Sequence, residues 1–258
     1  MILLSPAKTL DFDTKVTSEV HSDLIFAEKA EYLASKLQKL SPGKLKSKMK
    51  ISDDLAQLNY QRFQTWEYPF DHSAKQAGFA FKGDVYQGLE IEKFSNNELK
   101  FAQDNIRILS GLYGMLRPMD LILPYRLEMG TKWAVTSKKN SLYKFWKPEL
   151  TAKLKKQLDE NQSKFLLNLA SQEYAKAVDF KQIDIPVLTP EFKEERGGEY
   201  KMISFFAKKA RGLMTAYAVK NEITDMEDLK GFDYEGYGFN ARLSENKELN
   251  WVFTRKTK

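Results

Sequence analysis

Apolar residues along the first third of the chain recur at intervals typical of helices. Residues 1–5 read Met-Ile-Leu-Leu-Ser, four apolar residues and a serine, and are expected to be a buried strand rather than a signal peptide. Helical spacing follows in Phe26, Ala30, Leu33, Leu37 and Leu40. This pattern predicts one helix that ends at residues 41–43, Ser-Pro-Gly.

Two further helices are predicted from capping signals. Ser52 has the character of an N-cap, and the helix after it is expected to present Leu55, Leu58, Phe63 and Trp66 on one face. Residues 95–98, Ser-Asn-Asn-Glu, fit a capping box. The helix that they begin is predicted to align Leu99, Ala102, Ile106 and Leu109, and to end at Gly111.

The second half of the chain predicts helices alternating with strands. Residues 141–160 are expected to form two helices, with Pro148 opening the second. A helix is predicted over 208–222, and a capping box at 224–227 is expected to begin another that Gly231 closes.

Short strands are predicted over 164–169, 185–188 and 200–206, and 191–198 is interpreted as an exposed loop. The C-terminal alternation of Leu249, Trp251 and Phe253 predicts a strand that pairs with 234–241 across a turn at 244–247. Together these elements predict one mixed α/β domain over 1–258, with a mixed β-sheet, surrounding helices and a C-terminal β-hairpin.

Composition narrows the possible chemistry. The chain has no cysteine, which excludes disulfides, thiol peroxidase chemistry and cysteine metal sites, and its two histidines, His21 and His72, are not spaced as metal ligands. No metal site and no cofactor are predicted, although the composition leaves a metal site made of carboxylates alone open. The net charge of +6 favours anionic partners, although a mildly basic protein without such a partner would have the same charge. No apolar run is long enough to span a membrane.

Three predicted strands run into loops rich in hydroxyl groups and cations. The first junction contains Ser5, Lys8 and Thr9, the second Ser171, Glu173 and Tyr174, and the third Lys208, Lys209 and Arg211. Ligands of α/β sheets bind beyond the carboxyl ends of the strands, so these loops could form one anion site. The alternative is that the serines are simple caps and the lysines are solvated.

Two shorter segments could add to such a site. Lys82, Gly83 and Asp84 place a cation and a carboxylate beside a flexible glycine, although a polar turn would have the same sequence. Arg126 and Glu128 lie on one side of an extended segment, where they either form a structural ion pair or bind an anion, with Glu128 orienting Arg126.

Residues 110–118 form the most distinctive local pattern. A helix is predicted to end there, a glycine-bounded hairpin follows, and Pro118 could begin a second helix, which together would form a helix-hairpin-helix element. Such hairpins hold a DNA phosphate without reading bases. The predicted DNA contacts are Ser110, Gly111, Tyr113, Gly114 and Arg117. An ordinary helix C-cap with a turn explains the same residues.

Lysines are also concentrated between residues 36 and 50, where no acidic residue occurs. They are Lys36, Lys39, Lys44, Lys46, Lys48 and Lys50. Such a run is usually a solvated face, but it would also suit a phosphate backbone.

Six motifs in order resemble the YaaA family of bacterial peroxide-stress proteins. They are SPAKT at 5–9, FKGDVY at 81–86, LSGLYGMLRPMDLI at 109–122, PYRLEMG at 124–130, NLASQEY at 168–174 and SFFAKKARGLM at 204–214. The resemblance implies a cytoplasmic bacterial protein that protects cells from hydrogen peroxide and from damage by unincorporated iron. It also implies DNA binding through a basic cleft and a helix-hairpin-helix element, which would correspond to residues 110–118 with helices near 95–109 and 115–122.

Two functions follow from these observations. The first is DNA binding without sequence specificity. The second is an enzyme that acts on a phosphate-bearing small molecule, nucleotide or nucleic acid at the strand-end loops, with catalytic candidates Lys8, Asp84, Glu128, Glu173 and Tyr174. The anion-binding candidates are Ser5, Lys8, Thr9, Lys82, Gly83, Arg126, Ser171, Lys208, Lys209 and Arg211. A shared pocket would favour the enzyme, whereas separate ion pairs would argue against it.

Overall fold

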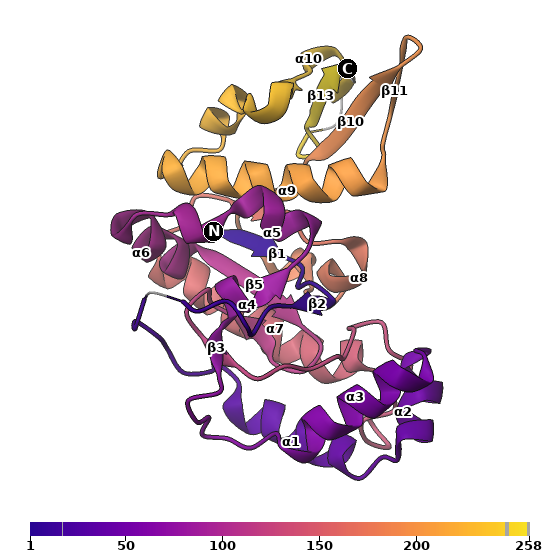
Figure 1. The fold of residues 1–258 in the computed structure, drawn as a ribbon. Coiled ribbons are helices and arrows are strands. Elements are labelled where there is room, and N and C mark those ends of the chain that lie inside the picture. Colours follow the sequence, from indigo (N-terminus) through magenta and orange to yellow (C-terminus); the bar gives the residue numbers. More distant parts are fainter. Residues whose placement is uncertain (17, 246–247, 257–258) are drawn as a thin grey trace.

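The computed structural model describes residues 1–16, 18–245 and 248–256, and it has the predicted mixed α/β architecture (Figure 1). Its central sheet has the strand order β6-β5-β1-β8-β9. These strands are β1 Ile2–Leu4, β5 Ile106–Ser110, β6 Gly114–Leu116, β8 Leu166–Asn168 and β9 Val187–Leu188. All neighbouring pairs are parallel except β5 and β6.

Helices surround this sheet and extend beyond it. They are α1 Ala27–Gln38, α2 Pro42–Met49, α3 Asp53–Gln64, α4 Ala77–Ala80, α5 Asp84–Leu89, α6 Asn96–Asn105, α7 Leu142–Glu160, α8 Gln172–Ala175, α9 Ser204–Lys220 and α10 Ala241–Ser244. Short 3-10 helices are Ile91–Lys93, Phe180–Gln182, Glu227–Gly231 and Tyr234–Gly236. Figure 1 shows α1, α2 and α3 gathered at one end of the molecule.

A second sheet of four strands lies at the opposite end, across α9 from the central sheet (Figure 1). Its order is β11-β10-β13-β12, from β10 Glu191–Arg196, β11 Glu199–Lys201, β12 Gly238–Phe239 and β13 Val252–Lys256. Two small antiparallel pairs complete the strands, β2 Thr9–Leu10 with β4 Phe81–Lys82 and β3 Lys75–Gln76 with β7 Leu121–Ile122.

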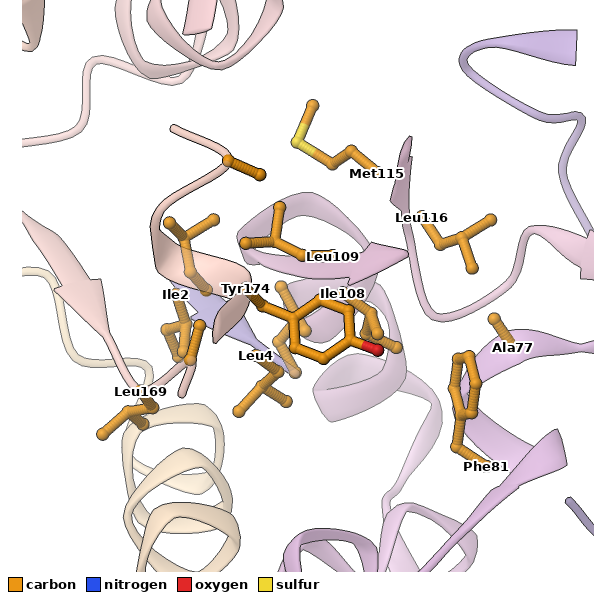
Figure 2. Packing of buried hydrophobic residues seen from close by; sticks show 14 of the residues in the cluster. Ile2, Leu4, Ala77, Phe81, Ile108, Leu109, Met115, Leu116, Leu169 and Tyr174 are labelled. Carbon is orange, nitrogen blue, oxygen red and sulfur yellow. The ribbon is translucent and has the colours of Figure 1, made fainter. Parts of the chain in front are cut away.

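Buried apolar side chains connect the central sheet, the second sheet and the surrounding helices. One cluster extends from Met1 to Phe253, which is consistent with the predicted single domain. In Figure 2, Ile2, Leu4 and Ile108 of neighbouring strands lie around Tyr174. Full burial on both faces explains why these short strands are almost entirely apolar.

Close packing of α5 against α9 holds the second sheet to the core. A Cβ atom on Gly212 would lie 1.8 Å from the Val85 carbonyl oxygen, and one on Gly88 would lie 2.3 Å from that of Lys209. Only glycine at both positions allows the two helix backbones to approach this closely.

Several predicted elements differ in the structure. The capping box at Ser95 is present, but α6 ends at Asn105 and the predicted helix positions Ile106 and Leu109 belong to strand β5. Helix α7 is continuous through Pro148 rather than two helices. Helix α1 ends at Gln38, before the predicted end at 41–43, and that motif begins α2 instead, because Pro42 is suited to a first helical turn.

The second half also needs corrections. Residues 204–206 are the first turn of α9, not the end of a strand, and the predicted exposed loop at 191–198 contains strand β10. The Glu227 amide is bonded to Asp225, and the helix there is a short 3-10 turn rather than one begun by a capping box.

The predicted C-terminal pairing is confirmed in part. Phe239 lies opposite Phe253 in antiparallel register, but α10 occupies part of the connection. Residues 246–247 of the predicted turn lie outside the described residues. On α3, Ser52 caps the helix as predicted, whereas Leu55 and Leu58 are exposed and the buried face carries Ala56, Asn59 and Phe63.

Candidate functional site

The ends of β1 and β8 meet at the switch point of the central sheet. The chain runs from β1 to β5 on one side and later places β8 on the other side. Ser5 and Ser171 follow these two strands, and the Ser5 hydroxyl oxygen accepts a hydrogen bond from the Ser171 amide at 2.8 Å. The two hydroxyl groups are 3.2 Å apart. Two of the predicted strand-end loops therefore meet where open α/β sheets bind ligands.

Three buried tyrosines surround this edge. The Tyr86 hydroxyl donates to the Ser5 carbonyl at 3.0 Å, and the Tyr125 hydroxyl is bonded to the Ser110 hydroxyl at 2.7 Å. Burial raises the pKa of Tyr86, Tyr125 and Tyr174 well above the ordinary tyrosine value. At neutral pH the three hydroxyls consequently stay protonated.

One carboxylate holds two cations beside the tyrosines. The Arg126 guanidinium donates to one Glu128 oxygen at 2.8 Å, and the Lys8 ammonium lies 3.1 Å from the other. The Lys8 side chain is 64% exposed, whereas those of Arg126 and Glu128 are 19% and 25% exposed. The predicted Arg126–Glu128 ion pair is confirmed, and Lys8 joins it.

Arg126 retains an unused donor. Among the described residues, its Nε atom is one of two buried side-chain nitrogen or oxygen atoms that have no hydrogen-bond partner. A buried donor left unpaired costs about 1–3 kcal/mol, so such atoms are rare in folded proteins.

A pocket lies against these groups. Residues 6–8, residues 125–128 and Tyr174 line this small pocket, whose cavity is about 20 Å³. At its α8 side, the Glu173 carboxylate accepts a hydrogen bond from the Gly130 amide at 2.8 Å. Lys8, Arg126, Glu128 and Tyr174 thus converge in one place, with Glu173 close by.

Other predicted anion-binding residues lie outside this pocket. Thr9 pairs with Lys82 across β2 and β4, and the Lys82 ammonium is 3.2 Å from the Asp11 carboxylate. A second cavity is lined by Lys82, Gly83 and Asp11 together with Lys75, but Lys75 already donates to the carbonyls of Asp11 and Thr14. Asp84 is the first residue of α5.

The third predicted junction is separate from the first two. Lys208, Lys209 and Arg211 lie on α9, which does not follow a strand of the central sheet. Lys209 pairs with Glu235, which also binds Arg255 of the second sheet. Burial lowers the pKa of Arg211. None of the three lines the pocket beside the ends of β1 and β8, and their sharing one site with the first two loops stays a prediction.

The predicted helix-hairpin-helix at residues 110–118 is a β-hairpin. Strands β5 and β6 pair there in antiparallel register, and Ser110, Gly111, Tyr113 and Gly114 are buried. A Cβ atom on Gly111 would lie 2.2 Å from the Leu127 carbonyl oxygen. These residues serve the core, so they are not available to hold a DNA phosphate.

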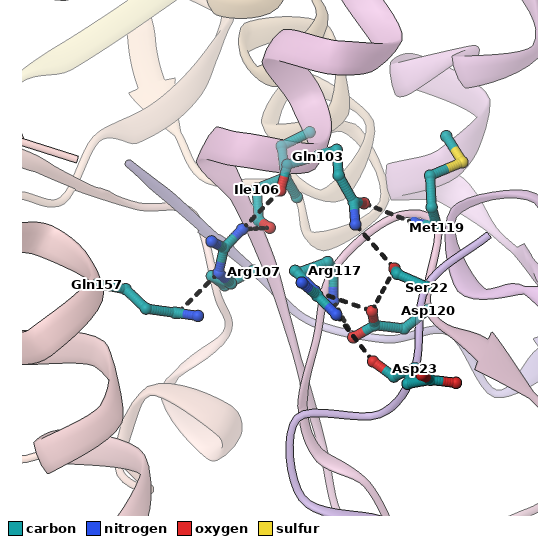
Figure 3. A network of polar contacts seen from close by, with 9 residues as sticks. All are labelled: Ser22, Asp23, Gln103, Ile106, Arg107, Arg117, Met119, Asp120 and Gln157. Carbon is teal, nitrogen blue, oxygen red and sulfur yellow. Dashed lines mark hydrogen bonds and ion pairs between the residues drawn. The ribbon is translucent and has the colours of Figure 1, made fainter. Parts of the chain in front are cut away.

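Arg117 is part of a polar network near the same hairpin (Figure 3). It donates to the buried Asp120 carboxylate at 2.9 Å and to the Asp23 carbonyl at 2.8 Å. Gln103 connects this pair to Arg107: its side chain donates to the Ser22 hydroxyl, which donates to Asp120, and its carbonyl accepts from Arg107. Burial lowers the pKa of Arg107 to about 10. Arg117 is therefore held by structural contacts.

A lysine-rich helix, α2, occurs elsewhere and forms a basic helix pair with α3, although α3 itself begins with Asp53 and Asp54. Residues 50–52 connect the two helices, with Lys50 in the left-handed conformation at φ 53°, Ile51 buried and Ser52 capping α3. Lys46 pairs with Asp53 at 2.7 Å. Within the part of the chain that the structure describes, Lys44, Lys48 and Lys50 have no carboxylate within ion-pair distance.

Sequence reasoning missed several residues of these sites. Tyr86 and Tyr125 lie within the motifs FKGDVY and PYRLEMG, but no feature of the sequence indicated that these two tyrosines would lie at the site. Asp11, which binds both Lys75 and Lys82, lies in a segment for which no motif was recognised. Trp133 lies 5.9 Å from the Lys48 ammonium and connects the loop after β7 to α2.

Two negative observations apply to the described residues. They contain no group of three or more acidic or histidine side chains placed to hold a metal ion. None of their helices combines the length and the apolar character needed to cross a bilayer.

Comparison with known proteins gives consistent matches over the chain. A family model described as "Peroxide stress protein YaaA" matches residues 1–243. A protein named "UPF0246 protein" from Saccharophagus degradans is 49% identical over 257 residues, which cover 99% of both chains. Proteins with the same name from Teredinibacter turnerae and Colwellia psychrerythraea are 48% and 47% identical, also over 99% of each chain.

Proposed function

The chain belongs to the family of the peroxide stress protein YaaA, and from this premise we propose that it binds DNA through the basic helix pair α2–α3. In this proposal the protein contacts the phosphate backbone in the bacterial cytoplasm and does not read the base sequence. By covering the backbone it would lower the access of iron-generated radicals to DNA during peroxide stress.

The single observation that carries the proposal is the set of unpaired lysines on this helix pair. Lys44 and Lys48 are four residues apart, which places them on one face of α2, and Lys50 follows directly after the helix. None of the three has a carboxylate partner in the described chain. Lysines that are not neutralised within the protein can replace the counterions of DNA phosphates.

The adjoining loop extends the same basic surface. Lys48 lies over the Trp133 ring, and Lys132, next to Trp133, is exposed. Lys138, further along the loop, is also exposed. Phosphates along a duplex recur at regular intervals, so a surface with several separated lysines suits contacts to the backbone.

The connection between α2 and α3 also favours this function. The turn is short, and buried Ile51 anchors it in the protein, so the position of Lys50 is fixed relative to both helices. A lysine held in this way could make contacts to the phosphate backbone, which carry no sequence information.

Fluorescence anisotropy with a labelled duplex of mixed sequence tests the proposal at about 50 mM salt. The test variant combines Lys44→Ala, Lys48→Ala and Lys50→Asn, because asparagine tolerates the left-handed conformation of residue 50. The control combines Lys100→Ala, Lys164→Ala and Lys181→Ala, three exposed lysines on other elements that carry the same total charge.

We expect the test variant to bind at least about tenfold more weakly than the wild type, and the control to lose less than about threefold. Equal losses in the two variants would assign binding to net charge rather than to α2–α3. Wild-type protein that does not bind the duplex would contradict the proposal itself.

A further inference from the structure

We propose that the pocket beside the ends of β1 and β8 binds a small phosphomonoester, with Arg126 and Lys8 as the groups that hold its phosphate. This site is separate from the helix pair proposed to bind DNA. It is built by the loop after β1, the segment 125–128 and the start of the chain after β8.

The location is the first argument. Ser5 and Ser171 join neighbouring parallel strands at the point where the chain changes direction in the sheet. The next residues along both loops, Pro6 and Tyr174 among them, line the pocket. Crevices at this position of open α/β sheets are the usual ligand sites of such folds.

The unused donor of Arg126 is the second argument. The guanidinium has five N–H donors, and its one hydrogen bond to Glu128 uses Nη2. Its buried Nε is without a partner. A phosphate oxygen pair accepts two parallel N–H donors from a guanidinium, so a shift of the Arg126 side chain towards the mouth of the pocket would let a phosphate satisfy the buried Nε atom.

The charges favour a dianion over a neutral ligand. Glu128 gives one oxygen to Arg126 and the other to Lys8, so this trio retains one net positive charge. The nearby Glu173 carboxylate accepts from the Gly130 amide and keeps its negative charge, so the phosphate would approach from the side of Lys8 and Arg126. Exposed Lys8 can turn from Glu128 to the phosphate without disturbing the core.

The shape of the pocket selects a terminal phosphate. Buried Tyr125 and Tyr174 close its inner side, and both hydroxyls remain protonated. A phosphodiester within a polymer needs room for the chain on both sides, whereas a monoester needs only one opening. The enclosed space is only about 20 Å³, so the phosphate would lie at the mouth of the pocket, beside the exposed Lys8 ammonium.

Isothermal titration calorimetry and ³¹P line broadening with inorganic phosphate, phenyl phosphate and dimethyl phosphate test the proposal at matched ionic strength. We expect the two dianions to bind with a dissociation constant on the order of 1 mM or below. Dimethyl phosphate, a diester with one charge, should bind at least about tenfold more weakly.

The variants are Arg126→Lys and Lys8→Ala. Arg126→Lys keeps the positive charge but removes the paired N–H donors of the guanidinium, and Lys8→Ala changes an exposed side chain. We expect Arg126→Lys to weaken phosphate binding at least about tenfold and Lys8→Ala about fivefold. Lys156→Ala, in an exposed ion pair with Glu160 on α7, is the control and should bind as the wild type does. Circular dichroism checks folding, and if Arg126→Lys does not fold, Lys8→Ala decides alone.

Absence of phosphate binding by the wild type at about 20 mM would overturn the proposal. Unchanged binding by the folded pocket variants, or equal binding of dimethyl phosphate, would also overturn it. The α2–α3 variant should bind phosphate normally, so the outcome does not depend on whether the protein binds DNA.

Discussion

The Ser5 hydroxyl oxygen accepts the Ser171 backbone N–H at 2.8 Å, and this bond joins the carboxyl ends of two neighbouring parallel strands. Ser5 also presents its carbonyl to the Tyr86 hydroxyl at 3.0 Å. A single residue therefore connects β1, the loop before α8 and helix α5. This connection fixes the loops that carry Lys8 and Tyr174 to the pocket.

Replacing Ser5 by alanine should destabilise the protein by about 1–3 kcal/mol, because the Ser171 amide then loses its acceptor. Ser171→Ala keeps that amide bond and should cost less than about 1 kcal/mol. Urea denaturation of the two variants measures the difference. Equal effects would show that the hydroxyl pair, and not the amide bond, holds the strand ends together.

Gly114→Ala should destabilise the protein about 2 kcal/mol more than Gly197→Ala, which is the matched control. Both glycines have left-handed backbone angles, with φ of 73° and 61°. A Cβ atom on Gly114 would lie 2.6 Å from the Trp146 ring, whereas one on Gly197 would meet nothing within 4 Å. Thermal unfolding measures the two losses of stability. Equal losses would mean that the Trp146 ring moves aside for the added methyl group without destabilising the protein.

The pH dependence of stability should reveal the Asp11 interactions. The Thr14 amide, followed by the Thr14 hydroxyl, lowers the pKa of the Asp11 carboxyl, with Lys82 and Lys75 contributing less. A lowered carboxyl pKa stabilises the fold above the ordinary aspartate value near 4. This contribution is lost as the pH falls through the lowered pKa of the folded state.

Asp11→Asn should therefore reduce the melting temperature at pH 7, and its difference from the wild type should shrink as the pH is lowered towards 3. Asp54→Asn, at an exposed position of α3, is the control. A difference for Asp11→Asn that stays constant from pH 7 to pH 3 would contradict the proposed role of the ionised carboxylate.

Local sequence signals predicted the starts of elements better than their ends. The capping box at Ser95 is present, and Ser52 caps α3. Ile106 and Leu109 continued the helical spacing of α6, yet they lie in a strand that is buried along its whole length. A fully buried strand has no polar alternation, so spacing alone cannot separate it from a buried helix face.

The candidate pocket could be predicted only in part. Ser5 and Ser171 were identified because each follows an apolar strand, and parallel pairing with β1 brings β8 to its side. Lys208 and Lys209 resembled a third strand exit because aromatic Phe205 and Phe206 precede them, but these aromatics begin a helix. The long-range approach of Lys8 to Glu128 depends on tertiary packing that no local pattern records.

The structure also exchanges the roles of two segments that were considered for DNA contacts, residues 110–118 and the lysine run between residues 36 and 50. The distinctive residues 110–118 form part of the core, where glycine is required by close contacts. The lysine run, for which a solvated face was the ordinary explanation, extends from the end of α1 through α2 to the turn before α3. Whether a lysine is exposed and whether it forms an ion pair depend on residues that are far apart in the sequence but close in the folded chain. A local sequence pattern does not record these neighbours.

The salt dependence of DNA affinity tests the central proposal most directly. For wild-type protein, log affinity should fall linearly with log salt between about 50 and 200 mM, with a slope of about −0.9 for each phosphate contact. The variant that combines Lys44→Ala, Lys48→Ala and Lys50→Asn should have a slope shallower by about 2 to 3. Identical slopes for the two proteins, or a wild-type affinity that does not change with salt, would contradict DNA binding through α2–α3.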